Sequence, residues 1–181
     1  MKTIRLRLGK ERSLLRRHPW IFDGAIAKGS ADAGETVRVE SHEGAFLAWA
    51  AYSPASKIRA RVWSFDESQR IDASFLIASI SNSVRARERF DVQSDGVRLV
   101  HGESDGLPGL IVDRYGDTLV AQFSSAGVER WKAVLADGRL YQGLNALKKD
   151  NTGYDLKHLM RTIMRSSVSE GCWAMVRLSV S

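Results

Sequence analysis

The feature that most limits how this chain can fold is an alternation of apolar and charged residues in its first part. Valines alternate with charged residues over residues 35–40, a turn follows at residues 42–44, and apolar residues return over residues 46–48. Residues 57–65 alternate in the same way. A period of two places successive side chains on opposite faces of a β-strand. Each segment is therefore predicted to be a strand with one buried face.

Two earlier segments complete this pattern. Residues 3–9 alternate aliphatic and basic side chains, and residues 20–26 form a short apolar strand with a turn. Between them, residues 10–17 favour a helix that directs Leu14 and Leu15 inward. Five short strands and one helix in so short a stretch predict a compact, barrel-like domain over residues 1–72.

The pattern changes after this domain. Apolar residues at helical spacing predict a helix over residues 72–90, and a further helix is expected from Val128 to Leu135. Between the helices, turn-rich sequences separate three predicted strands, at Val97–Val100, Leu110–Asp113 and Thr118–Phe123. We therefore expect a small α/β module with an antiparallel sheet. The predicted fold class is α+β.

The last segment, residues 138–181, has no such regularity. It contains no clean strand pattern and one plausible helix, Tyr154–Met164. Few periodic apolar positions mean that ordering this segment costs entropy with little burial in return. We expect three parts: the barrel at residues 1–72, the α/β module at residues 73–137, and an irregular, poorly packed tail.

The charge of the chain is concentrated near its start. The formal net charge is +6, and residues 1–20 hold one acid, Glu11, against seven basic side chains: Lys2, Arg5, Arg7, Lys10, Arg12, Arg16 and Arg17. A basic cluster favours a polyanion such as RNA, because neutralised phosphates release counterions. An ordinary charged, solvated surface is an equal alternative. No apolar run is long enough for a membrane span, and the single Cys172 excludes an internal disulfide, so we expect a cytoplasmic protein.

Residues 14–24, together with Lys10 and Arg12, are the first candidate RNA-binding segment. Lys10, Arg12, Arg16 and Arg17 can bind phosphate, and the rings of His18, Trp20 and Phe22 can stack on unpaired bases. For Trp20 and Phe22, which share one face of a strand, we expect core packing instead. For His18, a base contact or pH-sensing role and a structural role in the turn before Pro19 both stay open.

A second candidate segment follows the predicted hairpin. Its hydroxyls and cations can contact a phosphate backbone. The alternative is an ordinary Ser-Pro turn that leads into an edge strand protected by charge. The residues concerned are Tyr52, Ser53, Ser56, Arg59 and Arg61.

Catalytic signatures are weak throughout the sequence. Four carboxylates lie close together at Glu103, Asp105, Asp113 and Asp117, but the glycines around them indicate turns between strands. Nothing near Cys172 would activate its thiol. The sequence lacks a Gly-x-Gly-x-x-Gly loop, a P-loop lysine and a His-Glu-x-x-His motif. We therefore assign no catalytic, cofactor-binding or metal-binding residue.

Several strings in this chain resemble one enzyme family. SLLRRHPWIFDGAI, GETVRVESHEGAFLAWAAYSPASKIRARVW and GESDGLPGLIVDRYGD followed by LVAQFSSAGVE are similar to the N-terminal portion of the bacterial 23S ribosomal RNA cytosine-C5 methyltransferase I family. The resemblance implies a PUA domain that binds RNA over residues 1–72 and a central domain over residues 73–137. In that family, a later domain binds S-adenosylmethionine and carries out methylation.

The resemblance ends near Gly138, and the sequence has no counterpart to the methyl-donor and catalytic motifs. We expect an RNA-binding portion that is truncated before the catalytic domain and inactive alone. The alternatives are a non-functional truncated or frameshifted product and a subunit that needs a separate catalytic chain. The sequence does not indicate the target nucleotide or the oligomeric state.

Overall fold

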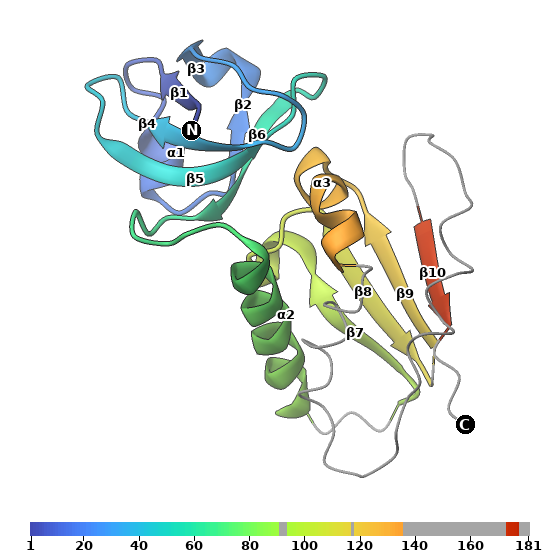
Figure 1. The fold of residues 1–181 in the computed structure, drawn as a ribbon. Helices are drawn as coiled ribbons and strands as arrows, with labels where there is room; N and C mark the ends of the chain where they lie inside the picture. Colours follow the sequence, from blue (N-terminus) through green and yellow to red (C-terminus); the bar gives the residue numbers. More distant parts are fainter. Residues whose placement is uncertain (91–93, 117, 136–172, 178–181) are drawn as a thin grey trace. The chain divides into compact units, whose positions relative to one another are not determined.

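The computed structural model describes residues 1–90, 94–116, 118–135 and 173–177 (Figure 1). Contacts divide the chain into two compact units. The first consists of Met1–Asp72 and Ser125–Arg130, and the second of Ala73–Ser124 and the residues from Trp131 onward. Each unit is described by itself.

The first unit is built on a curled sheet, which has six strands among the described residues, in the order β2-β6-β5-β4-β1-β3 (Figure 1). β1 and β4 are parallel, and the other neighbouring strands are antiparallel. A one-turn helix, α1 (Arg12–Leu15), and a 3-10 turn at Asp23–Ala25 connect the first strands. The strands are β1 (Thr3–Leu6), β2 (Trp20–Phe22), β3 (Ile26–Lys28), β4 (Thr36–Glu40), β5 (Phe46–Tyr52) and β6 (Ile58–Ser64).

The core of the first unit follows the alternation that predicted the strands. Val37 and Val39 of β4 and Ala60 of β6 are fully buried, and Val62 is nearly so. Ile4 and Leu6 of β1 are also fully buried in the same cluster. The predicted barrel-like domain is confirmed, although residues 20–28 form two strands rather than one.

Two expectations about the first core are wrong. Leu14 is buried, but Leu15 is 67% exposed. A helix of one turn presents only one side chain to the sheet, and neighbouring helical residues point in different directions. In β2 the buried residue is Ile21, whereas Phe22 is 49% exposed and Trp20 is half-buried. The face that we expected in the core is therefore the outer face.

The second unit packs a helix, α2 (Ala73–Glu88), with an antiparallel sheet of order β10-β9-β8-β7. Leu76, Ile80 and Val84 are fully buried at a spacing of four residues. The sheet strands are β7 (Gly96–His101), β8 (Leu110–Tyr115), β9 (Thr118–Phe123) and β10 (Trp173–Arg177). A further helix, α3 (Ala126–Val134), is divided between the units: its residues up to Arg130 belong to the first unit and those from Trp131 to the second.

The predicted turn after β7 contains a structural ion pair. The Asp105 carboxylate accepts a hydrogen bond from the His101 backbone N–H at 2.6 Å and pairs with Arg87 of α2. Arg87 also donates to the Arg98 carbonyl at 3.2 Å. Asp113 pairs with the Arg98 guanidinium at 2.8 Å. Asp105 therefore links α2 to the turn after β7, whereas Asp113 links β8 to β7.

One strand, β10, lies within the last segment, where the sequence has no clean strand pattern. β10 pairs antiparallel with all of β9, from Trp173 opposite Gln122 to Arg177 opposite Thr118. Its sequence, WAMVR, lacks alternating charge, and this is why it gave no strand signal. The predicted helix at Tyr154–Met164 lies outside the described residues.

Candidate nucleic-acid interface

The end of α1 has an unusual backbone conformation. The His18 N–H donates to the Ser13 carbonyl at 3.0 Å, and the Arg17 N–H donates to the Leu14 carbonyl at 2.8 Å. This pair of bonds defines a Schellman motif, which normally has glycine at its left-handed position. Here that position is Arg17, with φ at +63°. A side chain at such a φ costs about 1–2 kcal/mol.

The strained residue places its cation over an aromatic ring. The Arg17 guanidinium lies 4.8 Å from the centre of the Phe65 ring, just beyond β6. The segment between α1 and β2 runs beside β6, because the Val62 N–H donates to the Pro19 carbonyl at 2.8 Å. α1 and the end of β6 therefore present their side chains on one surface.

The outer face of β2 and β6 adds a second cation and ring. Trp20 and Arg61 are direct strand partners, and the Arg61 guanidinium lies 5.6 Å from the centre of the Trp20 ring. The His18 ring meets the indole edge-on at 5.7 Å, and its Nδ1 accepts a hydrogen bond from the Trp20 N–H at 3.2 Å. His18 therefore has the structural role in the turn while its side chain stays exposed.

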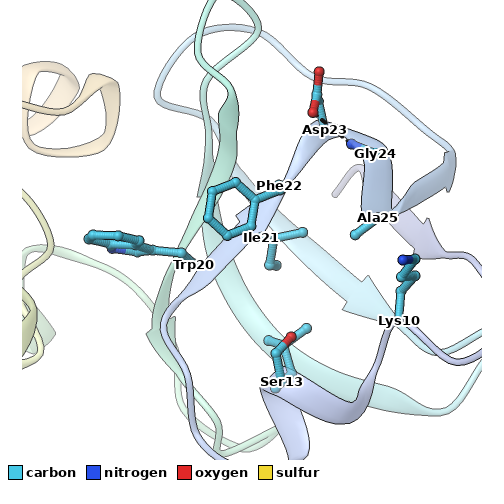
Figure 2. A pocket seen from close by; sticks show the side chains of 9 residues that line it. Lys10, Ser13, Trp20, Ile21, Phe22, Asp23, Gly24 and Ala25 are labelled. Carbon is cyan, nitrogen blue, oxygen red and sulfur yellow. Dashed lines mark hydrogen bonds between the residues drawn. The ribbon is translucent and has the colours of Figure 1, made fainter.

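A pocket of about 320 Å³ opens between α1 and β2 (Figure 2). Ile21 and Phe22 lie on one side of it and Lys10 on the other, with Ser13 below. Asp23 is at its top, where the carboxylate accepts a hydrogen bond from the Gly24 N–H at 2.7 Å. The pocket is thus lined by an exposed aromatic ring and an amine, and the Asp23 side chain points away from both (Figure 2).

The remaining candidate residues differ in accessibility. Lys10, Arg12 and Arg16 are exposed on or beside α1. Arg59 is half-buried, with its guanidinium 3.7 Å from Asp23, and the half-buried Ser56 hydroxyl accepts a hydrogen bond from the Ile58 N–H. Tyr52 and Ser53 are each only 7% exposed. We therefore omit these last two residues from the candidate surface.

We use the name α1–β2 surface for the accessible side chains just described. It consists of Lys10, Arg12, Arg16, Arg17, His18, Trp20, Ser56, Arg59 and Arg61. Sequence reasoning missed two residues that contact this surface, Phe65 beside Arg17 and Asp23 near Arg59. Phe65 had no signal, because it is 48 residues from the arginine that contacts it. Asp23 was interpreted only as part of a turn.

Three other acids in the first unit, Glu40, Asp32 and Glu35, are paired with arginine or lysine. Arg5 Nη2 donates to Glu40 Oε2 at 2.8 Å, and Arg38 Nε donates to Glu40 Oε1 at 3.2 Å. The hydrogen bond from Arg5 is the main reason that the pKa of Glu40 lies below its ordinary value. Hydrogen bonds from Lys2 likewise lower the pKa values of Asp32 and Glu35.

Within the described residues, no group of His, Cys, Asp or Glu side chains could hold a metal ion. No helix in that part of the chain is long and apolar enough to cross a membrane.

Comparison with known proteins identifies relatives for most of the chain. A family profile described as a PUA-like domain matches residues 4–65. The ribosomal RNA large subunit methyltransferase I of Escherichia coli strain SMS-3-5 is 52% identical over 132 residues, and that of strain UTI89 is 51% identical. Both matches cover 70% of this chain. The chain spans about a third, 33%, of the length of these relatives.

Solved structures share the fold. A candidate SAM-dependent methyltransferase from Streptococcus mutans matches 79% of this chain and 39% of its own, with a TM-score of 0.67 and 19% identity. A candidate methyltransferase in complex with SAH, SMU.776, gives the same TM-score and identity and is covered to 38%. At this identity the likeness shows the fold alone. Residues 4–65 therefore match a PUA-like domain, and 70% of the chain is similar to about a third of the ribosomal RNA large subunit methyltransferase I.

Proposed function

We propose that this chain binds RNA, with ribosomal RNA as its target, through the α1–β2 surface. It acts as the recognition portion of an S-adenosylmethionine-dependent ribosomal RNA cytosine-C5 methyltransferase. The relatives named above support the substrate class, since both are ribosomal RNA methyltransferases by name. The observation that carries the proposal is the grouping of exposed cations and aromatic rings on one face of the PUA-like domain.

Cations and rings have separate tasks on such a surface. Arginine and lysine bind phosphate, and this contact supplies affinity without sequence preference. Aromatic faces stack on unpaired bases, which favours single-stranded or looped RNA. Arg17 beside Phe65 and Arg61 beside Trp20 combine the two. A guanidinium that already lies near a ring is partly oriented before RNA arrives.

The test is a charge reversal on this surface. We expect Arg16→Glu, Arg17→Glu and Arg61→Glu together to weaken binding to any RNA. Each lost phosphate contact lowers the slope of log affinity against log salt by roughly 0.7 for a single strand, so three contacts lower it by about 2. The slope is measured by fluorescence anisotropy at several salt concentrations.

A matched variant controls for total charge. Lys28→Glu, Arg85→Glu and Arg89→Glu change the net charge equally, at exposed cations outside the α1–β2 surface. This control should keep most of the wild-type slope. The proposed surface is wrong if both triple variants bind RNA with the wild-type affinity and slope.

Trp20 gives an independent test of stacking. The half-buried indole lies on the outer face of β2, so Trp20→Ala should leave the fold largely intact and reduce RNA affinity by about 1–3 kcal/mol. Urea denaturation and RNA titration of the same sample separate these effects. A loss of about 3–5 kcal/mol in folding stability would instead show that the ring acts as core.

A further inference from the structure

The pocket between α1 and β2 has apolar walls that the fold leaves uncovered. Leu14 and Ile21 line it and belong to the core, where they are only 3% and 2% exposed. Phe22 lines it as well, but this residue is 49% exposed (Figure 2). At about 320 Å³, the pocket is at the lower end of the range for small-molecule sites, which is about 300–1,000 Å³. It is therefore suited to a small planar group.

The polar side chains that line the pocket from the α1 side are hydrogen-bond donors. Lys10 supplies an amine and Ser13 a hydroxyl, and both residues are exposed (Figure 2). Within the described part of the chain, no acid pairs with Lys10, whereas Lys2 is held by Asp32 and Glu35. The amine at the pocket is therefore available to a negatively charged ligand.

Asp23 also lines the pocket, but its side chain points away from Phe22 and Lys10 (Figure 2). The carboxylate accepts a hydrogen bond from the Gly24 N–H at 2.7 Å and lies 3.7 Å from the Arg59 guanidinium. It therefore does not compete with a ligand for the amine of Lys10.

An amine, a hydroxyl and an aromatic ring around one small cavity match the parts of a nucleotide. Lysine and serine side chains bind phosphate oxygens in protein–nucleic acid complexes. Aromatic rings stack on bases of any identity, because every base has a π-face. A base that is paired and stacked within a duplex does not present that face. The chemistry of the pocket therefore fits a nucleotide whose base is unpaired.

We infer that this pocket holds one unpaired nucleotide of the bound RNA. Phe22 stacks on the base, and Lys10 and Ser13 bind the phosphate. The inference rests on the proposed RNA binding and adds Phe22 and Ser13 to the residues that contact RNA. The α1–β2 surface supplies affinity for any RNA, and the pocket favours RNA with a bulged or looped nucleotide.

The experiment compares two RNA hairpins with the same stem, one with a single bulged uridine and one with an abasic nucleotide at the same bulge. The abasic nucleotide keeps the phosphate and the ribose but lacks the base. For the wild-type chain we expect roughly five- to hundredfold tighter binding to the uridine bulge in fluorescence anisotropy, because only this hairpin offers a base for stacking.

Two variants separate the contact with the base from the contact with the phosphate. Phe22→Ala should abolish the preference for the uridine bulge, because it removes the ring on which the base stacks. Lys10→Gln should weaken binding to both hairpins equally and lower the salt slope by about 0.7–0.9, because both hairpins retain the phosphate.

Phe90→Ala is the matched control, since it removes a phenylalanine that is 66% exposed in the second unit. It should keep the preference for the uridine bulge. Urea denaturation verifies that Phe22→Ala is folded, and the wild-type comparison of the two hairpins depends on no variant. Equal affinity of the wild-type chain for the two hairpins, or a preference that survives Phe22→Ala, overturns this inference and leaves the proposed function intact. Absence of salt-dependent binding to either hairpin overturns the proposed function itself.

Discussion

Arg17 permits a test in which glycine and alanine should have the opposite order of stability from that expected at a position with an ordinary helical φ. Its φ of +63° is a conformation that glycine adopts freely and other residues adopt at a cost of about 1–2 kcal/mol. Arg17→Gly relieves that strain, but the more flexible unfolded chain offsets about 0.4–1 kcal/mol of the gain. Arg17→Ala keeps the strain. Both variants lose the contact with Phe65.

We therefore expect Arg17→Gly to be more stable than Arg17→Ala by about 0.5–1 kcal/mol. Urea denaturation measures the difference, with tryptophan fluorescence from Trp20, Trp49 and Trp63 as the signal of the first unit. RNA binding should fall equally in both variants, with a salt slope lower by about 0.7, because each has lost the same cation. Stability and binding are thus separated at one position.

Arg16 is the matched control for this comparison. It is also an exposed arginine, but its φ of −88° is accessible to any residue. At this position alanine should be at least as stabilising as glycine. If alanine is also the better residue at position 17, the left-handed conformation of Arg17 does not exist in solution, and the Schellman ending of α1 is refuted.

Two further predictions concern the stability of the first unit. Leu14→Ala should cost about 2–5 kcal/mol and Leu15→Ala less than about 0.5 kcal/mol in urea denaturation, because only Leu14 is buried; equal costs would contradict the orientation of α1. Glu40 has a folded pKa below its ordinary value of 4.5, so its pairing with Arg5 stabilises the fold above that pH and is lost as pH falls through the lowered pKa. Glu40→Gln should therefore lose less stability than the wild-type chain on acidification below about pH 5, and parallel pH profiles would exclude this pairing.

The strands of the first unit were predictable because their alternation is regular and their core face is aliphatic. β4 and β6 bury Val37, Val39, Ala60 and Val62, as a period of two requires. In β2 the pattern left the choice of face undecided. It showed that Trp20 and Phe22 share a face, and their large apolar rings favoured the core.

Strand register decides that choice, and register is a property of two strands. Ile21 lies opposite Ala60, and Trp20 lies opposite Arg61. Since Ala60 is on the core face of β6, its partner Ile21 must be there as well, and a shift of β2 by one residue would turn Ile21 outward. A sequence segment inspected alone does not contain this information. β10 escaped prediction for a different reason, because its sequence lacks alternating charge.

The candidate site was predictable in place but not in geometry. Residues 10–22 supply most of the α1–β2 surface, so a local cluster of charge and aromatic residues was enough to find the segment. Strand pairing brings the residues of β6, and Phe65 just after it, next to this segment. No pattern within residues 10–22 predicts these contacts. Tyr52 and Ser53 do not belong to the α1–β2 surface because they are buried, although their sequence resembles that of an exposed turn.

The aromatic rings of Phe65 and Trp20 also divide the arginines of this surface into two groups. Some contribute only a positive charge, and others also contribute a planar guanidinium that stacks on a ring. Arg12 and Arg16 are exposed on α1, where a lysine would present the same charge to phosphate. Arg17 and Arg61 lie over aromatic rings, and a planar guanidinium stacks on a ring while still directing its N–H groups outward. Lysine offers only a point charge there. The strain stored at Arg17 is consistent with this division, because a residue needed only for charge would not require a left-handed backbone.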